Sequence, residues 1–166
     1  MQIWKRRVAG ILAIGGGALG IVVISTVLVQ QRKPLEWVFS LAFILLYAWG
    51  IWCGSRLLEG QPGAERSNAK FWLIQVPSFT SPVFSYFFSS GFHLTATLQF
   101  VPIETRVNFM LGSSFSYSLD EPSAAIAIGI NVFALAMWLW LAHEARRMKH
   151  GRSTRVPVSG TQNGEG

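Results

Sequence analysis

Charged side chains are scarce in this chain of 166 residues: 13% are Asp, Glu, Lys or Arg, whereas 51% are hydrophobic. A soluble domain usually carries about 25% charged residues. The charges also cluster, so that four long stretches hold none, namely residues 8–31, 37–55, 71–103 and 122–142. This distribution argues against an ordinary soluble globule and predicts an integral membrane protein.

Other absences narrow the function. The single cysteine, Cys53, excludes an internal disulfide bond. All eight acidic residues lie outside the interiors of the expected spans, which removes the ionisable groups that ion-coupled transporters need. On the expected topology, His93 and His143 lie on opposite sides of the membrane, and His150 belongs to a basic tail. The sequence therefore predicts no catalytic residue, no metal site and no cofactor.

Three of the uncharged stretches have the length of a membrane-spanning helix, because a bilayer core about 30 Å thick needs roughly 20 apolar residues. We predict spans over residues 8–30, 36–56 and 122–142. The first follows the basic run Lys5 to Arg7, as a signal peptide would. Its length, and the absence of a small-x-small cleavage site after it, favour an uncleaved helix.

The distribution of basic residues predicts a fourth crossing. With four crossings, eleven of the 14 basic residues lie on the side of the N-terminus and only Arg32, Lys33 and Arg106 lie opposite. With three crossings the division is seven to seven, so the positive-inside rule favours four, with both termini cytoplasmic in a bacterial inner membrane. The additional crossing falls at residues 71–88. Prolines there leave two alternatives: a kinked span, or a short helix followed by an extended segment.

Two segments beyond Gly91 alternate apolar and polar residues, which predicts β-strands. We expect a hairpin within residues 92–119, joined by residues 102–105, with Phe100 opposite Val107. Residues 83–88 are a candidate third strand. Because an open strand edge cannot lie in lipid, the hairpin is expected outside the hydrocarbon core.

The predicted fold is thus a predominantly α-helical integral membrane protein with four, or alternatively three, transmembrane helices. A small antiparallel β-hairpin or three-stranded meander is inserted before the last helix. Residues 1–150 form a single membrane domain, and residues 151–166 form a disordered basic and polar tail.

Small residues four apart on the expected helices are candidate packing surfaces, because helices in lipid associate through close approach. They serve either a dimer seam or packing within one chain. A polar side chain in the last span is expected to make an interhelical hydrogen bond. The candidate helix-packing residues are Ala9, Ala13, Gly16, Gly17, Gly20, Gly50, Gly54, Ala125, Gly129 and Asn131.

Two functions fit these patterns. The first is a non-catalytic component that binds a membrane-protein partner, or a second copy, through the helix seams or the β-ribbon edge. The alternative is a lipid or small-molecule handling subunit with an aromatic pocket between ribbon and helices. The lipid bilayer is the other expected partner, and no basic face with interleaved aromatics predicts nucleic-acid binding. The candidate pocket residues are Phe84, Tyr86, Phe92, Phe109 and Tyr117.

Overall fold

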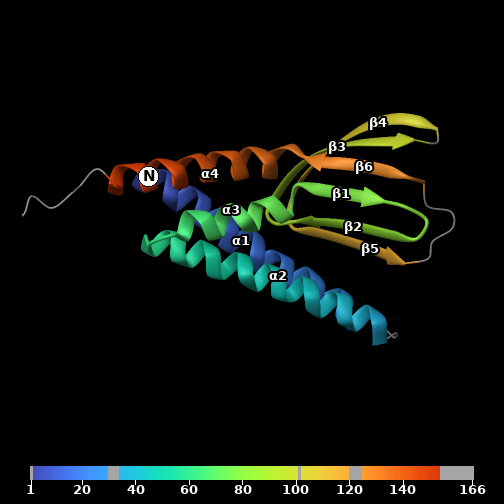
Figure 1. The fold of residues 1–166 in the computed structure, drawn as a ribbon. Helices are drawn as coiled ribbons and strands as arrows, with labels where there is room; N and C mark the ends of the chain where they lie inside the picture. Colours follow the sequence, from blue (N-terminus) through green and yellow to red (C-terminus); the bar gives the residue numbers. More distant parts are fainter. Residues whose placement is uncertain (1, 30–33, 101, 120–124, 154–166) are drawn as a thin grey trace, which may run out of the picture.

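The computed structural model describes residues 2–29, 34–100, 102–119 and 125–153 (Figure 1). The expected disordered tail lies outside these residues, except for 151–153, which end the last helix. In chain order the elements are α1 (Ile3–Leu28), α2 (Pro34–Glu59), α3 (Ala64–Ile74), β1 (Pro77–Thr80), β2 (Phe84–Ser89), β3 (Phe92–Phe100), β4 (Ile103–Leu111), β5 (Ser114–Leu119), β6 (Ala127–Asn131) and α4 (Val132–Ser153).

The helices α1 and α2 form a closely packed antiparallel pair, and small residues make their approach possible. A Cβ atom on Gly54 would lie 2.8 Å from the carbonyl oxygen of Gly10, and one on Gly17 would lie 2.7 Å from that of Tyr47. Side chains larger than hydrogen at these positions would hold the two backbones apart. The glycine pattern is therefore used for packing within the chain.

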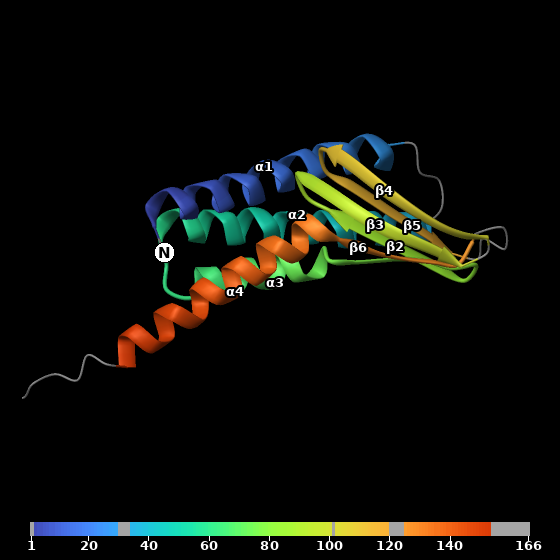
Figure 2. The same ribbon diagram turned by 90° about the horizontal axis from the view of Figure 1, so that it is seen from above.

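The six strands form one antiparallel sheet in the order β4-β3-β6-β1-β2-β5. Figure 2 shows that the sheet curls, so that it resembles half of a barrel, with β4 and β5 at its two ends. The strand β6, which follows β5 in the chain, returns to the middle of the sheet between β3 and β1. Strands distant in sequence are thereby brought together.

Strand register separates the side chains into an apolar and a polar face. Pairs such as Leu94 with Phe109, and Phe79 with Tyr86, place apolar residues together because successive side chains on a strand point to opposite faces. The polar residues of the same strands line the inside of the curl. The apolar face is formed by Pro77, Phe79, Phe84, Tyr86, Phe88, Phe92, Leu94, Ala96, Leu98, Phe100, Ile103, Val107, Phe109, Leu111, Phe115, Tyr117, Ile128 and Ile130.

Aromatic side chains attach one end of the apolar face to α2. The ring of Phe43 lies 5.1 Å from that of Phe115, and the ring of Tyr47 lies 4.8 Å from that of Phe88, measured between centroids. The Tyr47 hydroxyl also donates a hydrogen bond to the carbonyl of Ser89 at 2.9 Å. Aromatic pairs at these separations contribute about 0.5–1.5 kcal/mol each beyond their burial.

The prediction of a predominantly helical membrane fold with four or three spanning helices is wrong. Only α1 and α2, among the described residues, are long and apolar enough to cross a membrane, a criterion of length and composition alone. The expected third span, residues 71–88, holds the end of α3, the strand β1 and most of β2, and the expected fourth, residues 122–142, is divided between β6 and the first half of α4. Prolines at 77 and 82 interrupt the first of them, and in the second the alternation Ile126, Ile128, Ile130 forms a strand before α4 begins. The lack of charged residues correctly located the apolar segments, but it does not distinguish a helix from a strand.

The predicted hairpin is also corrected in register and extent. Phe100 pairs with Ile103, not Val107, so the connection is two residues long. The second predicted strand is interrupted at Gly112, whose φ of +133° suits glycine, and its remainder, β5, pairs with β2. The register differs by four residues, an even number, so the apolar sets still share one face as predicted.

We predict that Gly16→Ala destabilises the fold whereas Gly15→Ala does not. A Cβ on Gly16 would lie 2.6 Å from the backbone nitrogen of Gly91 in the β2–β3 turn, while one on Gly15 would meet nothing within 4 Å. Both changes favour helix, but the first forces α1 and the sheet apart, which costs about 1–3 kcal/mol. Denaturant titration of both variants in micelles measures this. Equal midpoints would contradict the packing role of Gly16.

Candidate functional site

The strand β4 presents an open edge. Gly112 donates to the carbonyl of Gly91, which makes these residues a hydrogen-bonded pair. Such pairs alternate along an antiparallel ladder, so even-numbered residues of β4 bond to β3 and odd-numbered residues turn their N–H and C=O groups outward. No strand among the described residues pairs with that outer side. The outward-facing residues are Ile103, Thr105, Val107, Phe109 and Leu111.

Apolar side chains accompany these unpaired backbone groups. All nine residues of β4 are exposed, and Ile103, Val107 and Leu111 expose 81%, 69% and 73% of their surface. These side chains continue the apolar face past β3, where α2 no longer covers it. Soluble monomers rarely expose a contiguous apolar surface of this kind, so the edge and its apolar face together mark an interaction surface.

The predicted seams on α1 and α2 are buried inside the chain. Ala9, Ala13, Gly16, Gly17 and Gly20 all lie on the buried side of α1. On α2, Gly54 meets α1 and Gly50 meets the ring of Phe71 from α3. Of the two alternatives that the sequence left open, packing within one chain accounts for these residues.

The predicted seam in the last span is not on a helix. Gly129 lies in the middle of β6, and Ala125 precedes that strand. Asn131 ends β6, and its Oδ1 accepts a hydrogen bond from the backbone N–H of Ala134 in the first turn of α4 at 3.2 Å. Asn131 therefore caps a helix and makes no interhelical bond with this oxygen.

The aromatic residues predicted to line a pocket are packed together. Tyr117 stacks on Phe39 of α2 at 4.7 Å, Tyr86 stacks on Phe43 of α2 at 6.3 Å, and Phe84 touches Phe79 at 5.2 Å. Phe92 and Phe109 lie further along the sheet, 5.1 Å apart and edge to face. The interface between sheet and helices is filled at these residues.

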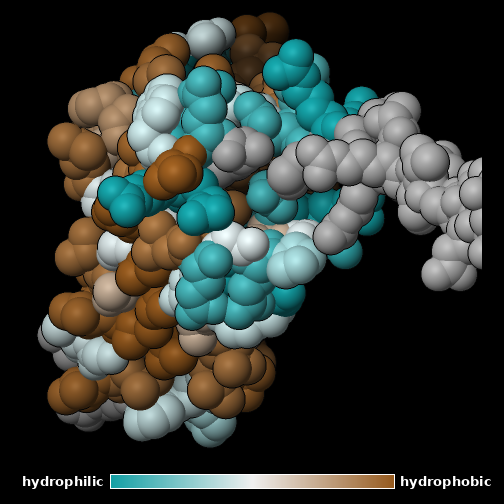
Figure 3. All heavy atoms as spheres, turned by 90° about the vertical axis from the view of Figure 1, so that its left-hand side faces the viewer, coloured by the Kyte–Doolittle hydropathy of each residue, from teal (hydrophilic) through white to brown (hydrophobic). Residues whose placement is uncertain are grey.

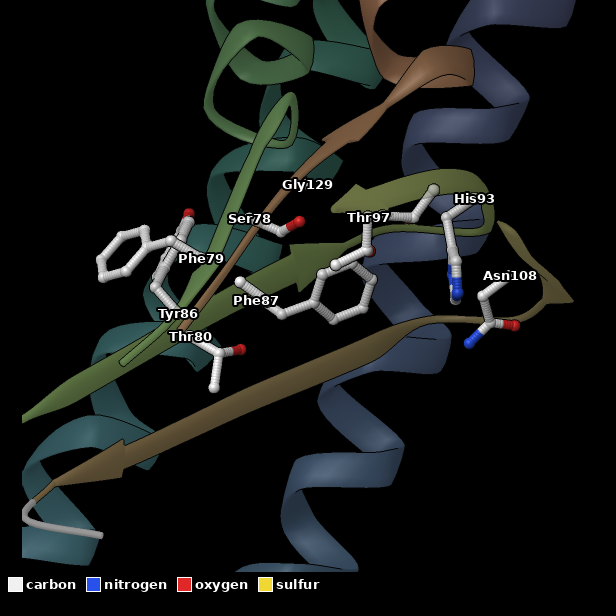
Figure 4. Close-up of a pocket in the computed structure, with 11 residues that line it drawn as sticks. Ser78, Phe79, Thr80, Tyr86, Phe87, His93, Thr97, Asn108 and Gly129 are labelled. Carbon is white, nitrogen blue, oxygen red and sulfur yellow. The ribbon is translucent and has the colours of Figure 1, made fainter. Parts of the chain in front are cut away.

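A cavity lies instead on the polar face, inside the curl of the sheet. Figure 4 shows Phe87 at its centre, with His93 and Asn108 on one side and Thr80 on the other. Its volume is 180 Å³. The lining residues are Ser78, Phe79, Thr80, Tyr86, Phe87, His93, Thr95, Thr97, Asn108, Ala127 and Gly129.

His93 and Thr95 are the most constrained polar groups of this cavity. They expose only 2% and 5% of their surface, and the His93 Nδ1 and Thr95 Oγ1 atoms have no hydrogen-bond partner among the described residues. Burial lowers the pKa of His93 below its usual value, because desolvation disfavours the charged imidazole. On the predicted topology, His93 lies on the hairpin outside the hydrocarbon core. In the sequence, His93 is one of the polar residues that alternate with apolar ones along this strand, which places it on the polar face of the sheet. That these polar residues are buried follows only from the curl of the sheet.

Neither a metal-binding cluster among the described residues nor a similar protein gives a lead to the function. Within the described ranges, no three His, Cys, Asp or Glu side chains are grouped so that they could hold a metal ion. Comparisons with protein-family models, curated proteins and solved structures each find no match for this chain. Any function must therefore be argued from the open edge, the apolar surface and the polar cavity.

We predict that stability falls as the pH is lowered from about 7 to 5, because the unfolded chain takes up a proton at His93 near its usual pKa of about 6.5, whereas the folded chain does so only at lower pH. His93→Gln should flatten this dependence. His143→Gln, at an exposed position of α4, should preserve it. Denaturant midpoints at the two pH values measure the effect, and a dependence unchanged by His93→Gln would disprove its origin.

Proposed function

We propose that this chain is a non-catalytic membrane protein that binds a partner polypeptide by adding a strand of that partner to β4. The observation that carries the proposal is the unpaired outer edge of β4, nine exposed residues long. A strand added to an edge gains main-chain hydrogen bonds, and alternate side chains on both strands then meet on one face. The helix seams contribute nothing to it, since they are buried within the chain.

Insertion of α1 and α2 into a bilayer is part of this proposal. A helix in the core of a soluble protein is mostly buried, but only 28% and 33% of the most apolar stretches of α1 and α2 are buried. Their exposed side chains include large apolar residues such as Ile11, Val22 and Leu45. Acyl chains are a better surrounding than water for such a surface.

One end of the molecule carries charged side chains, and this supports a particular orientation in the membrane. Figure 1 places the start of α1, the end of α2 and the far end of α4 at the same end, and Figure 3, which faces it, shows hydrophilic side chains gathered beside a hydrophobic flank. Lys5 of α1 lies 3.7 Å from Glu144 of α4 there. By the positive-inside rule, we propose that this end, with both termini, faces the cytoplasm of a bacterium whose inner membrane holds the protein.

The same placement makes the edge of β4 costly if it stays unpaired. The hydroxyl of Ser113, in the turn that follows β4, donates a hydrogen bond to the carbonyl of Gly16, halfway along α1. The strand β4 therefore ends beside the middle of that helix. A backbone N–H or C=O group without a partner costs several kcal/mol in hydrocarbon. A bound strand would satisfy these groups and cover the apolar side chains beside them.

The alternative function, a lipid or small-molecule handling subunit, has less support at the place where it was expected. The aromatic residues between sheet and helices contact Phe39 and Phe43 of α2, and of the five predicted pocket residues only Tyr86 lines the cavity described above, which lies on the other face of the sheet. Partner binding at β4 is therefore the better supported function.

We predict that Val107→Pro weakens partner binding about tenfold while leaving the sheet folded. Proline removes an N–H that points away from β3, and edge strands tolerate proline at such positions. A photo-cross-linking residue at Phe109, which is exposed on the same edge, reports the partner in native membranes. We expect a discrete adduct that maps to an extended segment of another protein and falls about tenfold in Val107→Pro.

Two control variants separate edge pairing from other effects. Val107→Ala trims the side chain but keeps the N–H, so the adduct should persist. Asn108→Pro removes an N–H that bonds to β3, so it should lower the unfolding midpoint, which Val107→Pro should not. Adducts to lipid alone would refute the proposal. Adducts only to a second copy of this chain would mean that β4 mediates self-association and does not bind a different protein.

A further inference from the structure

The polar cavity carries two buried hydrogen-bonding atoms, Nδ1 of His93 and Oγ1 of Thr95, for which the described part of the chain offers no partner. Both residues are more than nine-tenths buried and line the cavity from the same strand, β3. A buried polar atom without a partner costs about 1–3 kcal/mol, so such atoms usually serve water, strain or a ligand. Two of them in one hollow indicate that something polar is bound there.

The charge of the lining restricts the ligand. Every described lining residue is uncharged, and the hydrogen-bonding groups are hydroxyls, an amide and an imidazole. On the same face of β4, Arg106 lies opposite the lining residue Thr97, but its side chain is 70% exposed and already forms an ion pair with Glu104 at 2.7 Å. A neutral ligand that both donates and accepts hydrogen bonds matches the uncharged lining and needs no counter-ion there.

The ring of Phe87 and the size of the cavity restrict the choice of ligand further. Phe87 projects between the polar side chains, and its ring meets His93 edge to face at a centroid distance of 5.1 Å (Figure 4). The volume of 180 Å³ corresponds to about six water molecules in the liquid and is below the usual range for drug-sized ligands. A compact molecule with an apolar C–H face and hydroxyls around it suits this combination.

We propose that the cavity inside the curl of the sheet binds a neutral, hydroxyl-rich ring of monosaccharide size, with His93 and Thr95 as its principal hydrogen-bonding residues and Phe87 against its C–H face. The ring is either a free sugar or cyclitol or the headgroup of a neutral glycolipid. This binding site is separate from the edge of β4, and it holds whether or not a protein partner binds there.

The test uses the full chain in nanodiscs with ¹⁵N-labelled histidine. The His93 imidazole signals are assigned by their loss in His93→Gln. In one arm, phosphatidylcholine nanodiscs are titrated with glucose, galactose and myo-inositol; in the other, the nanodiscs contain monoglucosyl diacylglycerol and no free sugar is added. We expect saturable shifts of the His93 signals in one of the two arms, which also identifies the source of the ring.

Matched threonine variants distinguish a ligand-binding residue from a structural one. Thr95→Val removes the unpaired hydroxyl at nearly constant shape, so we expect affinity to fall about tenfold while the unfolding midpoint stays constant or rises. Thr105→Val, on the opposite face of the sheet, should change neither. Gly129→Ala, whose added methyl group would overlap Ser78 and come within 2.9 Å of Thr97, should also weaken binding.

The outcomes are decisive for the proposal. Shifts that Thr95→Val weakens and Thr105→Val does not would support it. Absence of saturable shifts in both arms would overturn it, and so would binding unaffected by Thr95→Val, because the hydroxyl would then serve no ligand.

Discussion

The contact between the aromatic residues of α2 and the apolar face of the sheet determines how the rest of the molecule is arranged. Phe43 and Tyr47 pack against β2 and β5, so the apolar face of the sheet must turn toward the helices. Because the strands alternate strictly, the polar face then points into the curl. The polar cavity, with its buried His93 and Thr95, and the exposed apolar surface of β4 are two consequences of this one orientation.

Close approach of backbones makes that contact possible. Gly16 touches the turn at Ser90 and Gly91, and the Gly10 and Gly54 backbones meet where α1 and α2 cross. Small residues thus serve two interfaces, helix to helix and helix to sheet. Since both are internal to the chain, the surface left for other molecules lies elsewhere, on the outer sides of α1 and α2, along β4 and inside the curl.

The surfaces of the molecule differ in the surroundings in which they are stable. The apolar sides of α1 and α2 suit lipid, while an open strand edge does not, because its N–H and C=O groups would lack partners in hydrocarbon. The partner strand proposed at β4 would reconcile the two, because it would pair these groups. The polar hollow is a separate feature, since its groups face away from α2 and are buried by the sheet itself.

The sequence alone determined the two N-terminal helices, the existence of strands beyond Gly91 and the shared face of their apolar residues, because hydrophobic length and period are local properties. It did not determine that residues 127–131 form a strand, since an uncharged apolar segment is compatible with either helix or sheet until its neighbours are known. The tertiary structure also decided the register of β3 and β4, the pairing of β5 with β2 and the burial of His93. These depend on contacts between segments far apart in the chain, where the curl of the sheet, and no local pattern, decides which polar residues lose contact with water.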